Sequence, residues 1–302
     1  MKTKEISIID FLTKRFPTDQ SAVDFFVEKR WGGNITCPYC KGDLVYKVSG
    51  TQPFKCGKCN FKFTEKTGTI MEGSHIKTRI WLLAMYIMGT ARKGISSIQM
   101  AKQLGVTQKT AWYMAHRIRE ACESTEKMRG IVEVDEVYIG GKEKNKHAYQ
   151  RMNYGRGVAN KIAVAGLKER NGQTIGKVIQ DTSSWTLQGL IQKNVLAKSA
   201  IFTDEHVSYV GLERKGYQHY AVKHSVGEYV DGMAHTNGIE SFWALLKRGL
   251  YGTYHSVSKK HLQRYVNEFC FKASQGNMSL SFVDAVCQKA NGNMLQYKQL
   301  TK

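Results

Sequence analysis

Glu240 and Lys247 combine residue types and a spacing that suit chemistry on a phosphate. They lie seven positions apart in a stretch whose pattern predicts a helix, so two turns place them on one face with Trp243 between them. A carboxylate fixed on a rigid helix suits a metal ligand, and an ammonium two turns further on suits a phosphate contact. A solvated helix face with a charge pair explains the same pattern, and this stretch alone does not separate the two interpretations.

The helix that would hold these side chains follows a loop that begins near Asp231. Thr236 and Asn237 are helix-starting residues, because their side chains can accept hydrogen bonds from the free N–H groups of the first turn. Apolar residues at spacings of three and four predict a buried stripe, formed by Ile239, Phe242, Leu246 and Leu250. We therefore expect an amphipathic helix with its charged pair on a different face.

Two cysteine pairs predict a metal site in the first part of the chain. Cys37 with Cys40 and Cys56 with Cys59 are separated by fifteen residues. Each pair can present two thiolates to one tetrahedral zinc ion, and four thiolates close its coordination sphere. The zinc would be structural, because no ligand position is left for water. A redox pair is the alternative, but redox sites use one pair. Short strands between the pairs complete a zinc ribbon.

Two predicted strands carry acidic residues among apolar ones. Residues 131–139 are rich in valine and isoleucine yet contain Asp135 and Glu136, and a later apolar run ends in Asp204, followed by Glu205. Burying a carboxylate costs several kcal/mol unless a cation or hydrogen bonds compensate. An edge strand with solvated acids is the alternative. Alternation alone does not decide whether Asp135 or Glu136 faces a site, and Glu205 raises the same question.

Residues 94–119 show the pattern of a helix-turn-helix. Ala101 is small where two helices would cross, Gly105 can adopt the left-handed conformation after the first helix, and Thr107 can cap the second. Many helical hairpins share this pattern without touching DNA, but the basic charge of this part favours DNA binding. The side chains expected on the groove-facing side are Gln108, Lys109, Thr110, Tyr113 and Arg117.

The net charge of +20 over 302 residues is spread along the chain. Residues 1–125 contain 20 Lys and Arg against 10 Asp and Glu, and residues 126–302 contain 25 against 15. A polyanion that touches both parts explains this, and nucleic acid is the commonest one. A membrane surface is the weaker alternative, because no long basic amphipathic helix is evident, and the longest apolar run, 80–88, is too short to span a bilayer. A basic loop that meets phosphates is expected at Lys142, Lys144, Lys146, Arg151 and Arg156.

The predicted order of elements is three strands, a helix, a strand ending in Asp204, a short strand and the Glu240 helix. This series resembles the ribonuclease H-like fold of DDE transposases and retroviral integrases. Three motifs look like those of insertion-sequence transposases with an N-terminal zinc ribbon, namely Val134–Gly141, His235–Gly249 and Gly252–His255. The cysteine pairs and the helix-turn-helix also occupy the places where that family has them, so the resemblance covers nearly the whole chain.

The resemblance implies that Asp135, Asp204 and Glu240 form an acidic triad, with Asp135 rather than Glu136 as the first acid. The 36 positions between Asp204 and Glu240 are close to the family's usual separation. Lys247 and Arg248 would lie near DNA phosphates. The chain departs from the family at Lys272, where an arginine, an aromatic residue and an asparagine are more common, so no role is carried over to Lys272.

The fold class implied is an α/β catalytic domain with a mixed sheet flanked by helices, preceded by a small zinc ribbon and a helical helix-turn-helix domain. The expected division is a helical prelude at 1–34, the zinc ribbon at 35–72, the helix-turn-helix domain at 73–126, the catalytic domain at 127–275, and a C-terminal helix and tail at 276–302.

Phosphodiester transfer needs an activated oxygen nucleophile and stabilisation of charge on the phosphate. Two Mg²⁺ or Mn²⁺ ions about 3.5–4 Å apart supply both, and they prefer carboxylate ligands. The resemblance implies that water frees a 3′-OH at the element's ends, which then attacks target DNA. The partners would be terminal inverted repeats, target DNA and a second copy of the chain, in a bacterial cytoplasm at the nucleoid. The alternatives are a DNA-binding regulator with an inactive catalytic-like domain, and a nuclease without strand transfer.

Overall fold

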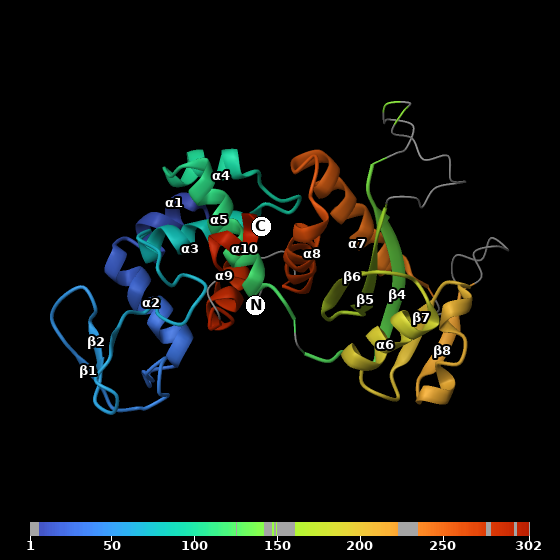
Figure 1. Cartoon of the computed structure of the whole chain (residues 1–302), viewed down its shortest axis with the longest axis horizontal. Helices are drawn as coiled ribbons and strands as arrows, with labels where there is room; N and C mark the ends of the chain where they lie inside the picture. Colours follow the sequence, from blue (N-terminus) through green and yellow to red (C-terminus); the bar gives the residue numbers. More distant parts are fainter. Residues whose placement is uncertain are drawn as a thin grey trace. The chain divides into compact units, whose positions relative to one another are not determined.

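The computed structural model describes residues 6–124, 126–141, 147, 149, 161–222, 235–275, 279–292 and 295–301. The chain divides into two compact units, one formed by residues 1–123 together with 275–302, and the other by residues 124–274 (Figure 1). The C-terminal segment therefore belongs to the same unit as the N-terminal helices. No helix in the described ranges is long and apolar enough to cross a membrane.

The first unit opens with short helices that are broken at Pro17. Helix α1 (Ile8–Asp10) continues into the π-helix η1 (Phe11–Arg15), and α2 (Asp19–Trp31) follows. Thr18 and Ser21 form a reciprocal capping box at the start of α2, and Gly32 ends it with φ +57°. Helices therefore lie on both sides of Pro17.

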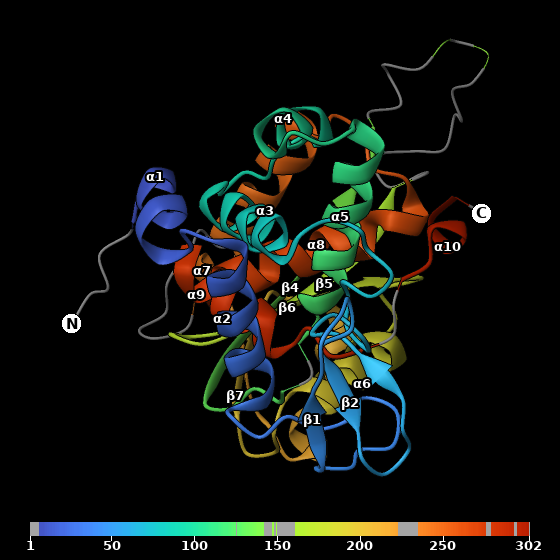
Figure 2. The ribbon, with the colours of Figure 1, turned by 90° about the vertical axis from the view of Figure 1, so that its left-hand side faces the viewer.

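The zinc ribbon is a three-stranded antiparallel sheet in the order β1 (Val45–Lys47), β2 (Phe54–Cys56) and β3 (Lys62–Phe63). Figure 2 shows these strands beside α2. Phe54 and Phe63 form its small core, and their rings lie 5.9 and 6.3 Å from Trp31 at the end of α2. The ribbon is therefore anchored to the helix that precedes it.

The rest of the first unit is helical and contains α3 (Thr78–Thr90), α4 (Ser97–Leu104), α5 (Gln108–Ala121), α9 (Ser279–Gln288) and α10 (Tyr297–Thr301). Helices α4 and α5 form the expected helix-turn-helix. Gly105 ends α4 with φ +66°, and the Thr107 hydroxyl accepts from the N–H of Thr110 to cap α5. Helix α9 packs against α3 and α2.

The second unit is built on a five-stranded mixed sheet in the order β6-β5-β4-β7-β8. The strands are β4 (Ile131–Ile139), β5 (Ile162–Glu169), β6 (Thr174–Ile179), β7 (Ala200–Thr203) and β8 (Gln218–Ala221). Strands β4, β5 and β6 are antiparallel neighbours, whereas β7 runs parallel to both β4 and β8. This topology confirms the ribonuclease H-like mixed sheet that the sequence predicts.

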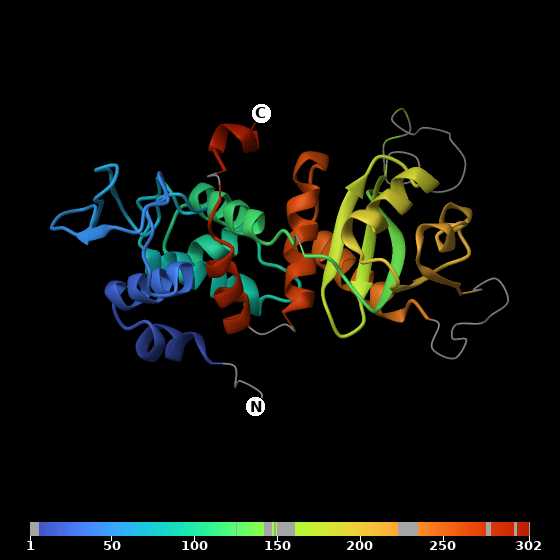
Figure 3. The same ribbon diagram turned by 90° about the horizontal axis from the view of Figure 1, so that it is seen from below.

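Helices cover both faces of the sheet (Figure 3). Helix α6 (Ser184–Asn194) packs with Val132 and Val134 of β4, together with the short 3-10 helix η4 (Val207–Tyr209). Helices α7 (Asn237–Arg248) and α8 (Lys259–Ser274) pack with Val137 on the other face, joined by the π-helix η7 (Gly249–Thr253). Strand β4 is therefore covered on both faces, a position in which acidic side chains are rare.

Candidate active site and metal-binding clusters

Asp135, Glu136 and Asp204 form an acidic cluster, in which one carboxylate oxygen from each lies within 4.8 Å of the others. The parallel pairing of β4 with β7 ends at Glu133 and Phe202, and Asp204 directly follows the last residue of β7. The carboxylate of Asp204 therefore reaches the middle of β4, just beyond the end of its neighbouring strand. The structure brings together two acids that lie far apart in the sequence.

Alternation along β4 separates the two neighbouring acids. Asp135 accepts from Trp243 of α7, which packs on the same face as Val137, whereas Glu136 accepts from the Tyr209 hydroxyl on the α6 face. Because α7 also carries Glu240, Asp135 is the acid that faces the predicted third member of the triad. Glu136 was left open by the sequence, and the structure adds it to the cluster from the opposite face.

The indole of Trp243 lies over Gly166, the residue of β5 that pairs with Asp135. A Cβ on Gly166 would lie 2.4 Å from the Trp243 ring, so only glycine leaves room for the indole. The Trp243 Nε1–H donates to Asp135 Oδ2 at 3.1 Å, while the N–H of Glu136 donates to Asp135 Oδ1 at 2.8 Å. Both oxygens of Asp135 are therefore held in a fixed orientation.

Glu240 lies one turn before Trp243 on α7 and is exposed. Its carboxylate is outside the 4.8 Å cluster of the described residues, but its charge contributes to raising the pKa of Asp135. Its Oε1 accepts from the hydroxyl of Thr236 at 2.9 Å. The structure therefore places Glu240 beside the cluster rather than within it, and Lys247 is exposed in the last turn of the same helix.

Glu133 holds the start of α7 against β4, a role that the sequence analysis missed. Its buried carboxylate accepts from the N–H of Ile239 at 2.9 Å and from Arg170 Nε at 3.1 Å. A second N–H of Arg170 donates to the carbonyl of His235, so the ion pair also fixes the residues before the helix. Negative charge at a helix N-terminus is favourable. An acid among valines was the available signal.

The expected capping by Thr236 is therefore replaced. Thr236 makes no side-chain hydrogen bond to the free N–H groups of α7, because its hydroxyl donates to Glu240 and the carboxylate of Glu133 accepts from Ile239 instead. Gly238 is required by this arrangement, since a Cβ there would lie 2.7 Å from Glu133 Oε2. The cap comes from a residue more than 100 positions away, which local sequence patterns do not reveal.

Burial and the charges of neighbouring carboxylates favour the protonated forms of Asp135 and Glu136. Desolvation, with smaller contributions from the charges of Asp204 and Glu240, raises the pKa of Asp135 to about 6. Desolvation and the charges of Asp204 and Asp135 raise the pKa of Glu136 to about 7. A divalent cation would relieve this repulsion. Three clustered carboxylates also match the oxygen ligands that Mg²⁺ and Mn²⁺ prefer, so the residues fit such an ion.

The four cysteines of the zinc ribbon form the second cluster, with one sulfur from each within 4.8 Å of the others. Cys37 Sγ lies 3.6 Å from Cys59 Sγ, and Cys40 Sγ lies 3.6 Å from Cys56 Sγ. The N–H groups of Lys58 and Cys59 point at Cys56 Sγ and favour its thiolate, and its pKa is lowered to about 7. Four converging thiols of this kind suit one tetrahedral zinc ion.

The predicted DNA-reading residues of α5 divide into two groups. Gln108 and Lys109 are exposed at the start of the helix, and Thr110 is half-buried. Arg117 was expected to face DNA, but it is buried, and its guanidinium donates to the carbonyl of Glu72 and lies over Trp81. The position ten residues into an amphipathic helix places Arg117 on the core side, so that expectation is corrected.

Tyr113 is also engaged, by the C-terminal segment of the same unit. Its hydroxyl donates to the carbonyl of Leu295 at 2.5 Å, and its ring lies 5.7 Å from Tyr297, which also contacts the ammonium of Lys109. The basic residues Lys142, Lys144, Lys146, Arg151 and Arg156 lie outside the described residues. Arg248 is exposed next to Lys247.

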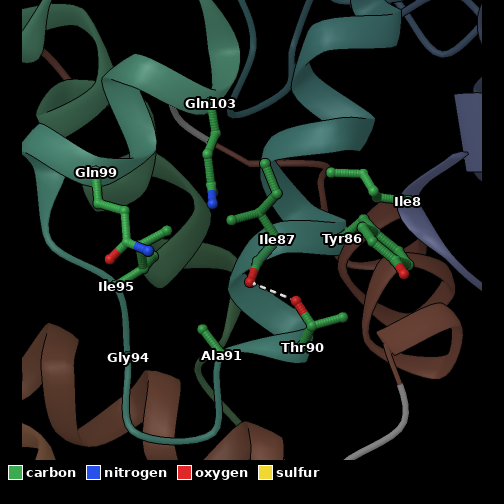
Figure 4. Close-up of a pocket in the computed structure, with 9 residues that line it drawn as sticks. All are labelled: Ile8, Tyr86, Ile87, Thr90, Ala91, Gly94, Ile95, Gln99 and Gln103. Atoms are coloured by element: carbon green, nitrogen blue, oxygen red, sulfur yellow. Dashed lines mark hydrogen bonds between the residues drawn. The ribbon is translucent and has the colours of Figure 1, made fainter.

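A separate cavity of about 330 Å³ lies in the first unit between α1, α3 and α4 (Figure 4). Its lining includes Tyr86, Thr90, Gln99 and Gln103, and it contains no carboxylate, histidine, cysteine or lysine. This cavity therefore lacks the groups that acid–base or metal chemistry requires, and the acidic cluster remains the candidate active site.

The fold and the acidic cluster are those expected of a DDE-type transposase domain, and two family matches agree. Residues 127–274 match the ISXO2-like transposase domain, and residues 17–61 match the transposase zinc-ribbon domain. Together the two domains cover more than half of the chain. The chain belongs to the ISXO2-like family of insertion-sequence transposases that carry an N-terminal zinc ribbon.

Two relatives extend this similarity. A protein in the transposable element ISH50 of Halobacterium salinarum is 27% identical over 270 residues, which cover 85% of this chain and 91% of that protein. A transposase-like protein of Haemophilus influenzae is 30% identical over 91 residues, which cover 30% of this chain and 72% of that protein.

Solved structures resemble the chain only weakly. A pre-cleavage Mos1 transpososome is 12% identical and covers 72% of this chain and 80% of its own, with a TM-score of 0.28. A mariner Mos1 paired-end complex with Mg covers the same shares at 11% identity and a TM-score of 0.29. TM-scores this low say nothing further about this chain.

Proposed function

We propose that this protein cleaves DNA at the ends of a mobile element in a metal-dependent reaction and joins the freed 3′-OH to target DNA. The observation that carries the proposal is the meeting of Asp135 and Asp204 at the end of β7, with the Glu240 helix packed on the face of Asp135. Membership of a transposase family supports DNA as the substrate. The partners proposed are terminal inverted repeats, target DNA and a second copy of the chain.

Metal binding, support of the metal ligands and contact with DNA would fall to different residues. Asp135, Asp204 and Glu240 would hold two Mg²⁺ or Mn²⁺ ions, which supply an activated nucleophile and stabilise charge on the phosphate. Trp243 keeps Asp135 oriented, and Glu133 keeps α7 in place. Lys247 and Arg248, exposed in the last turn of α7, would contact DNA phosphates. Rigid support of the acids matters because misplacement of a reacting group by about 1 Å can cost about 100-fold in rate.

The N-terminal parts would recognise the element's ends. The start of α5, with the exposed Gln108 and Lys109 and the half-buried Thr110, is the surface proposed to enter a major groove, because the first residues of a recognition helix contact base edges. The four cysteines would hold one structural zinc ion. A bacterial cytoplasmic location at the nucleoid is proposed from the DNA substrate.

The test uses full-length, zinc-loaded protein and labelled duplexes made from the DNA that flanks the coding region. Nicked and joined products are followed on denaturing gels with and without Mg²⁺ or Mn²⁺. We expect both products only with the ion, and a loss of about 100-fold or more in Asp135→Asn, Asp204→Asn and Glu240→Gln. Glu205→Gln is the matched control, because Glu205 is exposed beside Asp204 but outside the described cluster.

Three other outcomes would each contradict the proposal. Nicking without joined products would identify a nuclease of the same fold. Specific binding to the ends with no cleavage by the wild type would favour a DNA-binding regulator with an inactive catalytic-like domain. Equal activity in the wild type and the three acidic variants would remove the triad from the mechanism.

A further inference from the structure

The zinc ribbon exposes an unusual concentration of large apolar side chains. Four of the fourteen large apolar side chains that are exposed in the described residues lie between positions 39 and 61, namely Tyr39, Leu44, Tyr46 and Phe61. The small core of the ribbon is already filled by Phe54, Phe63 and Trp31. Because the core does not use these exposed apolar side chains, their concentration on so small a domain indicates a binding surface.

Tyr39 and Phe61 contact each other within this set. Their ring centroids are 5.1 Å apart, and the side chains are 54% and 60% exposed. Tyr39 lies between Cys37 and Cys40 in the first cysteine loop, and Phe61 follows the second loop, where its carbonyl accepts from the N–H of Cys56. A metal site that fixes both loops would also fix both rings, so the pair is preorganised for stacking.

Lysines lie close to the aromatic pair in the sequence. Lys41, Lys58 and Lys62 are exposed and lie within three positions of Tyr39 or Phe61 in the sequence. The side chain of Lys58 extends from the second cysteine loop across Gly42 of the first, within 3.5 Å of where a Cβ on Gly42 would lie. Five lysines and one aspartate occur between residues 35 and 64. This excess outweighs the negative charge of a zinc ion bound by four thiolates.

We propose that the Tyr39–Phe61 pair is a stacking platform for unpaired bases of single-stranded DNA, with Lys41, Lys58 and Lys62 contacting the backbone. Aromatic rings set among positive charges are the combination that binds single strands without sequence preference, because every base offers a flat face. A second copy of the ribbon is a poorer occupant, since two lysine-rich surfaces repel each other. This inference rests on the proposed function, in which cleavage creates unpaired ends.

The experiment measures binding of a fluorescent oligo(dT) by anisotropy, using the full-length, zinc-loaded chain with Glu240→Gln and no added divalent ion. Loss of DNA cleavage cannot affect this readout, so it is separate from the test of the proposed function. We expect Tyr39→Ala and Phe61→Ala each to weaken binding about 5- to 100-fold. Binding to a blunt duplex should change by no more than about twofold.

Two matched substitutions test the stacking itself. Phe61→Trp keeps a flat aromatic face and should bind oligo(dT) as tightly as Phe61 does. Phe61→Leu keeps an apolar side chain without a ring and should bind as weakly as Phe61→Ala. Zinc content, measured by release to a chromogenic chelator, verifies that each ribbon is intact. If Phe61→Ala fails to hold zinc, the tryptophan and leucine variants decide.

The lysines give an independent readout. Replacing Lys58 and Lys62 by glutamine should make the dependence of log Kd on log salt shallower by about 1 for oligo(dT). The proposal is overturned if Phe61→Leu binds oligo(dT) as tightly as the parent does, since that outcome shows that no aromatic ring is needed. It is also overturned if the alanine variants bind oligo(dT) like the parent, or if they abolish a concentration-dependent self-association, which would make the pair an interface between copies.

Discussion

Trp243 donates its indole N–H to Asp135 Oδ2 at 3.1 Å, across the contact between helix α7 and strand β4. The same helix carries Glu240 one turn earlier. The buried Trp243 ring therefore holds the helix of Glu240 against Asp135, and Gly166 on the adjacent strand leaves the space that the ring occupies. The candidate site therefore depends on residues that would not themselves touch a metal ion or DNA.

Substitution of Gly166 tests this dependence. A Cβ there would lie 2.4 Å from the Trp243 ring, so Gly166→Ala must displace the indole from Asp135. We expect the free energy of unfolding to fall by about 1–3 kcal/mol, the usual cost of overpacking a filled site, and DNA cleavage to fall with it.

Gly189→Ala is the matched control, because Gly189 lies in α6 with open space around its Cβ position. Denaturant unfolding should show no loss of stability there, since alanine favours a helix over glycine. Equal behaviour of the two variants would mean that the Gly166 contact does not constrain Trp243.

Glu133 provides a second test, at the start of α7. Glu133→Gln removes the charge that pairs with Arg170 and leaves one oxygen in place of the two that accept from Arg170 and from the N–H of Ile239. Breaking a buried pair leaves a charge uncompensated, and we expect a loss of about 3 kcal/mol in unfolding free energy. Amide hydrogen exchange at residues 238–241 should accelerate more than exchange in α8.

The control for this variant is Glu205→Gln, an exposed glutamate that should leave both measurements unchanged. Retained protection at residues 238–241 in Glu133→Gln would show that Glu133 does not hold the helix. Other contacts would then hold the start of α7 against β4.

Much of this arrangement was predictable from the sequence, because it follows from local patterns. The Glu240 helix, the cysteine pairs and the turn at Gly105 were each signalled by residue type and spacing over a few positions. The meeting of Asp135 with Asp204 was predicted only through resemblance to a family. Strand pairing between distant segments leaves no local pattern, so it had to be inferred from the order of elements.

The parts that were not predicted are tertiary contacts. Glu133 of strand β4 caps helix α7, and the buried guanidinium of Arg117 lies over the ring of Trp81. The sequence signals only that Glu133 lies among valines and that Arg117 lies on the core side of its helix, because the partner of each side chain is decided by packing over long separations. The choice between Asp135 and Glu136 also needed the structure, since it depends on which face of β4 receives α7.

The shifted carboxyl groups predict a pH dependence of the metal-free protein. Burial raises the pKa of Asp135 from 3.8 to about 6 and that of Glu136 from 4.5 to about 7. The folded state therefore binds protons that the unfolded state has released. This contribution to stability is complete below the ordinary pKa values and is lost as pH rises through about 6 and 7. Asp135→Asn should consequently stabilise the metal-free protein more at about pH 8 than at about pH 5.

The stability of the metal-free protein should fall as pH rises, whereas the stabilisation produced by divalent ions should increase. They must displace these protons at low pH, so the increase in Tm produced by Mn²⁺ should be larger at about pH 8 than at about pH 5. Thermal unfolding of zinc-loaded protein with and without Mn²⁺ measures both effects. An equal Mn²⁺ response at the two pH values would argue that the ion binds away from the acidic cluster.

The most direct test of the central claim is localised cleavage of the polypeptide by Fe²⁺ substituted for Mg²⁺ in zinc-loaded, full-length protein. With ascorbate and peroxide, a bound iron cuts the backbone beside its ligands, and mass spectrometry locates the cuts. We expect cuts near Asp135 and Asp204 that disappear with excess Mg²⁺ and in the double variant Asp135→Asn with Asp204→Asn. Cuts that lie elsewhere, or that persist in the double variant, would contradict the assignment of these acids as the metal site.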